Sequence, residues 1–376
     1  MTFCSCRRSH VSCRFESMNS DAKHFLFQLL NTPSPSGFEV EGQKVWLRFV
    51  SRFADAVEND AYGNAWAVRN GTSPSFKIML EAHADEIGFM IQNISEEGFL
   101  YVTRTGGSDR AIARGKRVQI LGDQGPVLGV IGNTAVHLRD SENEKVPQLH
   151  ELFIDVGARN RGEVESRGIR VGHPAVYVDS VEEITPGRMV GRAIDNRIGS
   201  FILAQVLANL AARGNRPVAT VQALNAVQEE IGSHGIKMAA YRLRPDLAIV
   251  LDVTHATDSP GIDRNKHGGT KLGGGPAITH GTANHPLLVQ RLIQIAQKAS
   301  IPLQHEASSR STGTDTDQLY LTRGGIPSAL VSIPLRYMHS TVEMVDLADV
   351  ERCILLLTDF VERLAETDGF KLDLLA

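Results

Sequence analysis

The amino-acid sequence predicts an α/β domain that is interrupted by a smaller β domain. Three observations support this fold class. The chain has 376 residues, of which 42% are apolar and 22% are charged, as is typical of a globular protein with more than one domain. Short β-type segments follow one another about every 8–12 residues between residues 89 and 188. Helical and strand patterns alternate on both sides of that region, as in a sheet with helices packed on its faces.

The composition excludes several classes of protein. A net charge of −4 and a sequence pI of about 6.4 leave no basic surplus for phosphate groups, so a nucleic-acid partner is not expected. The sequence has no apolar run of about 18 residues, so no membrane span is expected. Three of the four cysteines (Cys4, Cys6 and Cys13) lie in the first 13 residues, which is no disulfide framework. This cysteine usage predicts a reducing compartment and a cytoplasmic location.

Residues 1–17 are expected to be a disordered extension that lies outside the fold. The segment is rich in Ser, Arg and Cys, and it lacks both apolar periodicity and the apolar core of a secretory signal. It is interpreted as either a start codon assigned too early or a targeting segment. Met18 opens the first regular pattern, in which Ser20 is the expected cap of a helix. The apolar stripe of that helix consists of Phe25, Leu26, Leu29 and Leu30.

The segment from Ala22 to His83 is predicted to form one helix followed by two strands, the second at Phe76–Leu80. These elements are too few to complete a sheet, so this segment is expected to join the chain after residue 188. The predicted organisation is therefore a discontinuous domain of residues 18–88 and 189–376 around an inserted β domain of residues 89–188.

The inserted region is expected to form a small β-barrel or sandwich, because turn residues separate its strands and no long helix interrupts them. Its predicted strands are Phe89–Ile94, Phe99–Thr103, Arg117–Leu121, Val127–Ile131, Leu152–Val156 and Ala175–Val178. After residue 188, helices are expected over 198–210, 288–299 and 347–364, and strands over 218–226, 247–251 and 326–333.

Polar residues that can bind metals follow the predicted strands of the discontinuous domain. Sites in open α/β sheets form outside the carboxyl ends of the strands, so these side chains are expected to converge. Imidazole and carboxylate ligands together suit zinc, cobalt or manganese. The residues at these strand ends, together with one before the helix of Ile198, are His83, Asp85, Glu229, Glu230, Asp252, His339 and Asp195.

Simpler interpretations exist for several of these residues. His255 competes with His83 and His339 as a ligand, and Asp195 could cap the helix of Ile198. Glu229 and Glu230 could form a solvated pair, but they follow a long apolar run, where two uncompensated acids are costly. In a metal hydrolase, one of these carboxylates would bind metal while the other accepts the proton of a water molecule.

Six ordered segments carry a resemblance to a known family. They are Ala82–Gly88, Gly191–Arg197, Gln228–Gly232, Leu251–Thr254, Gly313–Asp315 and Pro334–Ser340. Over about residues 20–368 the chain resembles the glutamyl-aminopeptidase or tetrahedral-aminopeptidase family of metallopeptidases with two co-catalytic metals. The resemblance implies a zinc-peptidase-like three-layer α/β/α domain with an inserted small β-barrel domain.

The resemblance also implies a role for each candidate residue. His83 and Asp252 would bind one divalent ion, Glu230 and His339 would bind a second, and Asp195 would bridge them. Glu229 would be the general base, and Asp85 would orient His83. The ions would be zinc or cobalt, with manganese as the next choice, and the substrates would be peptides. The family further implies a homo-oligomer, often a dodecamer, which the inserted domain helps to build without supplying a metal ligand.

The sequence departs from the family pattern at Ala84, Asn196 and His280, which bears on substrate preference more than on the metals. The main alternative is a related metal-dependent amidohydrolase or deacylase. An endoglucanase, a name some relatives carry, would need two carboxyls flanking the bond but no histidine-rich metal site. A protein that binds without catalysis is the third class, and it would not need Glu229.

Overall fold

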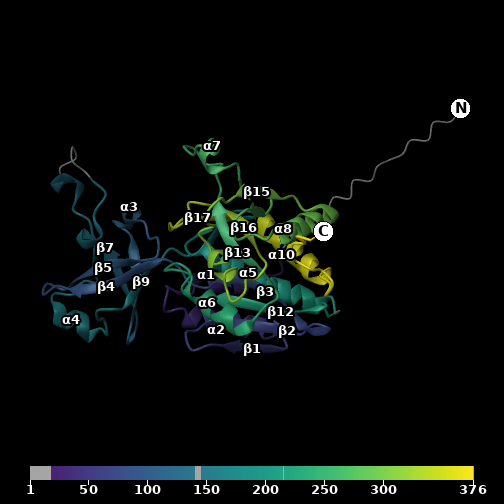
Figure 1. Cartoon of the computed structure of the whole chain (residues 1–376). Coiled ribbons are helices and arrows are strands. Elements are labelled where there is room, and N and C mark those ends of the chain that lie inside the picture. The colour runs from purple at the N-terminus through teal and green to yellow at the C-terminus, as the bar shows by residue number, and fades with distance from the viewer. Residues whose placement is uncertain (1–17, 140–144, 215, 376) are drawn as a thin grey trace.

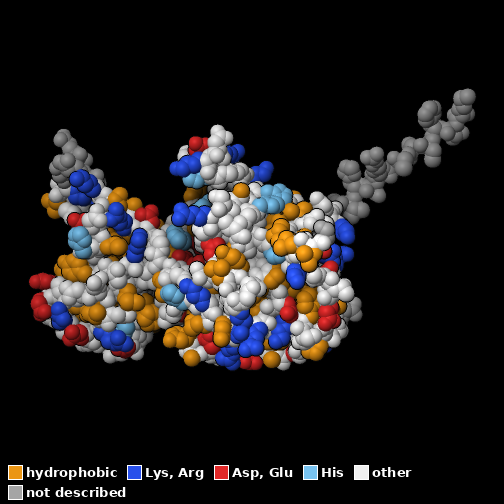
Figure 2. All heavy atoms as spheres, viewed as in Figure 1, with side chains coloured by type: hydrophobic (Ala, Val, Ile, Leu, Met, Phe, Trp, Pro, Cys, Tyr) orange, Lys and Arg blue, Asp and Glu red, His pale blue; other side chains and the backbone are white. Residues whose placement is uncertain are grey.

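The computed structural model describes residues 18–139, 145–214 and 216–375. The extension predicted for residues 1–17 lies outside these described residues. Figure 1 shows a β-barrel beside a larger body in which helices cover a sheet, and the same two lobes are visible in the space-filling view of Figure 2. The predicted α/β fold class with a small barrel is confirmed.

The large sheet has eleven strands, nine of them in the order β1-β2-β12-β3-β13-β16-β17-β11-β10. Its central strands β12, β3, β13 and β16 run parallel, so their carboxyl ends meet at one edge. The strand bounds are β1 Ala56–Asn59, β2 Ala65–Arg69, β3 Ser73–His83, β10 Glu182–Thr185, β11 Arg188–Gly191, β12 Ala219–Ala226, β13 Leu247–His255, β14 Ala277–His280, β15 Gln304–Ala307, β16 Ser328–Arg336 and β17 Glu343–Asp346.

Helices cover both faces of this sheet and complete a three-layer arrangement. One face packs against α1, α2, α5, α8 and α10, which share a single apolar core with it. The other face packs against α6 and α9 through a second core around Trp66 and Met79. The helices of this domain are α1 Ser20–Asn31, α2 Val40–Val50, α5 Ile194–Ala212, α6 His234–Leu243, α7 Arg264–His267, α8 Pro286–Ala299, α9 Thr316–Leu319 and α10 Leu347–Glu362.

Two local predictions near the start of the fold are wrong. The cap of α1 is Asn19, whose Oδ1 accepts a 2.8 Å hydrogen bond from the N–H of Ala22, and Ser20 is the first helical residue. The segment to His83 holds two helices and three strands rather than one helix and two strands. Helix α2 was not predicted, although Trp46, Phe49 and Val50 form an apolar stripe on the buried face that also includes Gly42 and Gln43. Gly42 is needed there, since a Cβ would overlap Ser34 Oγ.

The six predicted strands of the inserted region form a closed barrel rather than a sandwich, in the order β4-β5-β8-β7-β6-β9. The barrel has its own apolar core, which includes Phe89, Ile120 and Ile154. The large sheet resumes at β10, which pairs with β11. The elements of this region are β4 Gly88–Ile94, β5 Phe99–Thr105, β6 Arg117–Gly122, β7 Gly125–Ile131, β8 Phe153–Asp155, β9 Pro174–Tyr177, helices α3 Arg110–Ala113 and α4 Arg161–Ser166, and 3-10 turns at Val136–Leu138 and Leu149–Glu151.

Within the described residues, no helix combines the length and the apolar character that a membrane span requires.

Candidate metal centre

All seven predicted site residues meet at the carboxyl edge of the large sheet. His83 is the last residue of β3, Glu229 and Glu230 follow β12, and His339 follows β16. Asp195 lies in the first turn of α5, directly after β11. Asp252 lies within β13, which continues to His255 instead of ending at Leu251 as predicted. Six of the seven, all except Asp85, line a pocket of about 620 Å³.

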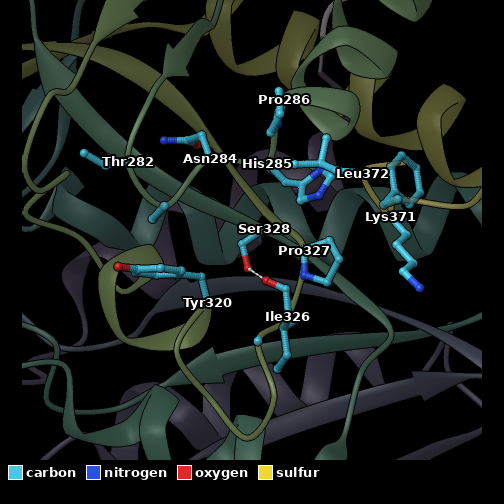
Figure 3. A pocket seen from close by; sticks show the side chains of 13 residues that line it. Thr282, Asn284, His285, Pro286, Tyr320, Ile326, Pro327, Ser328, Lys371 and Leu372 are labelled. Atoms are coloured by element: carbon cyan, nitrogen blue, oxygen red, sulfur yellow. Dashed lines mark hydrogen bonds between the residues drawn. The ribbon is translucent and has the colours of Figure 1, made fainter. Parts of the chain in front are cut away.

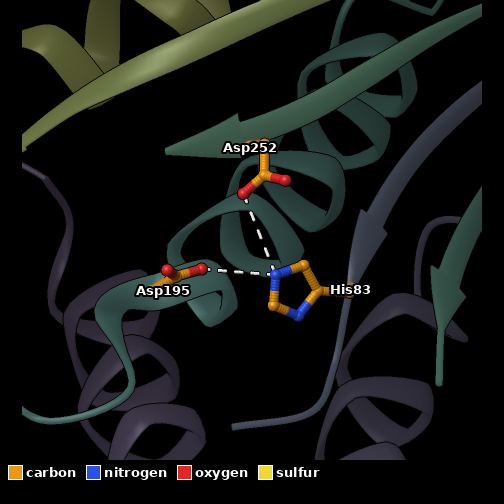
Figure 4. A group of neighbouring side chains, drawn as sticks. All are labelled: His83, Asp195 and Asp252. Carbon is orange, nitrogen blue, oxygen red and sulfur yellow. Dashed lines mark ion pairs between the residues drawn. The ribbon is translucent and has the colours of Figure 1, made fainter. Parts of the chain in front are cut away.

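One group of potential ligands is almost fully enclosed. His83, Asp195 and Asp252 present one ligand atom each, all within 4.8 Å of one another. His83 Nε2 lies 3.2 Å from Asp195 Oδ1 and 3.8 Å from Asp252 Oδ1, as Figure 4 shows. All three residues are buried, and we call them the strand group because His83 and Asp252 lie on strands.

A second group shares Asp195 with the first. Asp195, Glu230 and His339 also present ligand atoms within 4.8 Å of one another. His339 Nε2 lies 3.4 Å from Asp195 Oδ2 and 3.4 Å from Glu230 Oε1. Asp195 therefore directs Oδ1 to one group and Oδ2 to the other. The side chain of His339 is 33% exposed, and we call this set the loop group because Glu230 and His339 follow their strands.

Asp85 connects the strand group to the segment that carries the two glutamates. Its Oδ1 accepts a hydrogen bond from the N–H of Glu229, and its Oδ2 accepts one from the N–H of Glu230. Ser36 Oγ donates a third, at 2.6 Å, to Oδ2. Asp85 Oδ1 also lies 3.3 Å from His83 Nδ1, a close contact that is not aligned as a hydrogen bond.

Glu343 is a buried carboxylate that sequence reasoning missed. Its Oε1 accepts a hydrogen bond from the N–H of His339, and its Oε2 accepts one from the N–H of Asp195. Glu343 thus fixes the backbone of two members of the loop group. The only signal in the sequence is an acid four residues after His339, which is too common in loops to single it out.

The pocket holds an excess of negative charge. Its described lining includes five carboxylates and three histidines but neither lysine nor arginine. Burial raises the pKa values of Glu230 and Asp252 above their ordinary range. Burial opposes ionisation of Asp195 as well, but its contacts with His339 and His83 hold the pKa of this carboxyl below its usual value. Burial alone would lower the pKa of His339, whereas Asp195 and Glu230 raise it to about 11.

This donor set fits divalent metal ions. Buried carboxylates need compensating positive charge, and the three imidazoles of the pocket are fewer than its five carboxylates. Nitrogen and oxygen donors in small groups of three suit zinc, cobalt or manganese. His255, the competing candidate, lines the pocket at the end of β13 but belongs to neither group.

Glu229 lies beside both groups but is a member of neither. Its Oε2 is 3.9 Å from His83 Nε2. Burial, followed by the nearby carboxylates of Asp252 and Asp315, raises the pKa of Glu229 to about 10 in the protein alone.

A second pocket, of about 580 Å³, lies at the start of α8 and is drawn in Figure 3. It is bordered by Phe370 and Leu372 of the C-terminal segment. Ser328 Oγ donates a hydrogen bond to the carbonyl oxygen of Ile326 within it. Its described lining contains one histidine, His285, and no carboxylate, so it lacks the chemistry of the metal centre.

Comparisons with known proteins agree with the fold and identify the family of the chain. The family model described as M42 glutamyl aminopeptidase matches residues 63–356. The lysyl aminopeptidase of Pyrococcus furiosus is 32% identical over 344 residues, which cover 91% of this chain and 97% of that protein. The chain therefore belongs to the M42 glutamyl aminopeptidase family, and it is a hydrolase of the aminopeptidase class.

Solved structures of related enzymes show the same fold. A TET aminopeptidase from a marine sediment Thaumarchaeota archaeon has a TM-score of 0.89 and 32% identity, covering 93% of this chain and 99% of that one. The TET1 peptidase of Pyrococcus horikoshii, which can assemble into a tetrahedron or a large octahedral shell, has a TM-score of 0.79 and 27% identity. That match covers 91% of this chain and all of the other.

Proposed function

We propose that the protein is a two-metal aminopeptidase that releases the N-terminal residue of peptides. Residues 18–88 and 189–376 would form its catalytic domain, which also takes in β10 of the large sheet, so that the barrel inserted between the two segments ends after β9 rather than at residue 188. The observation that carries the proposal is the position of Asp195, whose two carboxylate oxygens face two different groups of ligands. A shared carboxylate of this kind is suited to hold two ions close together.

The ligands divide between the two ions as the groups do. His83 and Asp252 would hold one, Glu230 and His339 would hold the other, and Asp195 belongs to both groups of potential ligands. Zinc and cobalt suit these donors, and manganese is compatible with them. When bound, two such ions would polarise a scissile carbonyl group and lower the pKa of a water molecule.

Glu229 is proposed to be the general base. It accepts a proton from the attacking water and then passes a proton to the departing amine. Its raised pKa would keep it protonated at neutral pH in the protein alone. Divalent ions bound by the two adjacent ligand groups would oppose this rise in the pKa of Glu229. They would favour the ionised carboxylate that a general base requires. Asp85 assists by orienting the His83 ring and the backbone of Glu229.

Assembly into a homo-oligomer is also proposed. The Pyrococcus horikoshii relative can assemble into a tetrahedron or a large octahedral shell, and the match with this chain covers all of that chain. The barrel exposes several large apolar side chains, among them Leu128, Val136 and Leu138. Contiguous exposed apolar side chains mark protein interfaces, so these side chains are candidates for the contact between copies of the chain.

A substrate panel tests the proposed reaction. The purified full-length protein, supplied with zinc or cobalt, is offered aminoacyl-p-nitroanilides, their N-acetylated counterparts and a cello-oligosaccharide. We expect cleavage only of substrates with a free α-amine. Release of the acyl group from the acetylated amino acids would instead identify a deacylase, and release of sugar would identify a glycosidase.

A further inference from the structure

The barrel reaches the metal centre through the turn that follows β5. This turn consists of Gly106, Gly107 and Ser108, and Gly107 lines the same pocket as the candidate ligands. No barrel residue belongs to either ligand group, as far as the described chain extends. The two glycines therefore contact the centre without offering it a ligand.

Their contacts fall on the loop group. A Cβ atom at Gly107 would lie 2.6 Å from His339 Cε1 and closer still to His339 Nδ1. A Cβ atom at Gly106 would lie 3.1 Å from Glu230 Cβ and Oε2. His83 and Asp252 are not among the nearest neighbours of either glycine. The backbone of the turn thus packs against the two residues that distinguish the loop group from the strand group.

Hydrogen bonds and strand pairing hold the turn after β5 in a fixed position beside His339. Ser108 Oγ donates a 2.8 Å hydrogen bond to the carbonyl oxygen of Gly88, and Thr105 pairs with Gly88 in the barrel. Asp109, the next residue, caps α3 by accepting a hydrogen bond from Ala111.

His339 has less support of its own. It lies in a loop with φ of +60°, and the hydrogen bond from its backbone N–H to Glu343 leaves the ring free to turn about the side-chain bonds. Its Nε2 edge faces Asp195 and Glu230, while its Nδ1 edge faces Gly107. The Gly106–Gly107 turn therefore limits rotation of the His339 ring away from the other ligands.

We propose that the Gly106–Gly107 turn is a positioning element that sets His339 and Glu230 for the ion of the loop group. This inference rests on the proposed two-metal function. It assigns the barrel a part in the metal centre: a shift of the barrel relative to the sheet changes the affinity of the loop group and leaves the strand group unchanged. The glycines are required because any side chain at residue 107 would occupy the space of the His339 ring.

The test is metal binding by the full-length Gly107→Ala variant. Residue 107 does not have a positive φ, so alanine adds only the Cβ atom. The matched control is Gly324→Ala, whose Cβ would meet no described atom within 4 Å. Metal-free wild type and both variants are titrated with zinc by calorimetry, and cobalt absorption spectra report the coordination.

We expect Gly107→Ala to bind one ion with wild-type affinity and the second about 10–100-fold more weakly, as when a partner that orients a ligand is lost. The Gly324→Ala control should match the wild type. Two ions bound with wild-type affinity, or equal weakening of both, would overturn the proposal. A wild type that binds fewer than two ions would instead contradict the two-metal function itself.

A His339→Ala background separates positioning from general damage. If the turn acts through His339, adding Gly107→Ala to His339→Ala should cause no further loss of affinity, because the ring that the new methyl group displaces is absent. If Gly107→Ala alone fails to fold, the double variant should fold for the same reason. Additive losses, or a double variant that also fails to fold, would show that Gly107 serves the barrel alone.

Discussion

The strand group and the loop group share Asp195, yet different parts of the fold hold their remaining ligands. His83 and Asp252 lie two residues beyond Glu81 and Val250, the last pair of facing residues between β3 and β13. Since side chains alternate along strands, the register of the sheet brings both residues to the same face at the same level. Glu230 and His339 follow their strands, and the hydrogen bonds that their backbone N–H groups donate to Asp85 and Glu343 fix their backbone.

This difference predicts that the strand group is a rigid ion site and that the ligands of the loop group move more easily. The ligands of the strand group are buried and continuous with the sheet, whereas His339 is one-third exposed and depends on packing against the barrel turn. In an enzyme that needs both ions, the affinity of the loop group would determine how many active centres hold both ions at a given metal concentration.

The largest effect is expected at Glu229, which belongs to neither group. Glu229→Gln keeps the shape of the side chain but removes the base, so kcat should fall by about 10²–10⁴-fold while both ions stay bound. Steady-state kinetics and metal analysis of the same sample measure the two quantities. Loss of an ion in this variant would make Glu229 a ligand and reverse its role with that of Glu230.

The next effect separates the two groups directly. His339→Ala should leave about one ion bound per chain with little change in its affinity, because the strand group keeps His83 and Asp252. The affinity of the loop group should fall by more than the roughly 10–100-fold that follows loss of an orienting partner. Calorimetric titration of metal-free protein measures both steps. Simultaneous loss of both ions would show that the groups form a single unit.

Asp85→Asn should have an intermediate effect that reaches both groups. The amide cannot accept the hydrogen bonds from Glu229 and Glu230 with both of its terminal atoms, and it places no full charge beside His83. We expect metal affinity or kcat/KM to fall by about 10–100-fold. Rates within a factor of two of wild type would contradict the role assigned to Asp85.

The smallest effect on activity is expected for substitution of Glu39. This substitution should instead change how the free energy of unfolding depends on pH. This buried carboxylate accepts hydrogen bonds from the N–H groups of Gly37 and Gln228, and burial followed by the charge of Asp85 raises its pKa to about 7. Between about pH 4.5 and 7 the folded protein keeps a proton that the unfolded chain releases, so Glu39 makes stability fall as pH rises.

Glu39→Gln should remove this part of the pH dependence. Its free energy of unfolding should match that of wild type near pH 4 and exceed it by up to about 3 kcal/mol above pH 7, at about 1.4 kcal/mol per pKa unit. Urea unfolding of both proteins in metal-free buffer across that range gives the difference. A constant difference at all pH values would show that Glu39 does not titrate in this window.

The strand group was predictable from sequence for the same reason that it is rigid. An apolar run that ends in His83 or precedes Asp252 is visible locally, and parallel strands bring their carboxyl ends to one edge. The barrel strands were equally visible, because turn residues separate short apolar runs. Closure into a barrel rather than a sandwich was not, since it depends on the pairing of β4 with β9.

Features that depend on tertiary contacts were missed. Glu343 and Gly107 have ordinary surroundings in the sequence and gain their importance only where the loop after β16 meets the barrel turn. Helix α2 was missed although Trp46, Phe49 and Val50 lie on its buried face, because Gly42 and Gln43 occupy the buried positions of its N-terminal half and leave the apolar pattern short. The cap of α1 was misplaced by one residue because Asn19 and Ser20 are both good caps, and only the observed hydrogen bond separates them.

Metal analysis combined with chelation tests the central claim most directly. Full-length protein loaded with zinc or cobalt is expected to hold two ions per chain. Prolonged treatment with a strong chelator should remove both ions together with all hydrolysis of a free-amine aminoacyl-p-nitroanilide, and added divalent metal should restore activity. Full activity in a sample shown to be free of metal would contradict the two-metal mechanism.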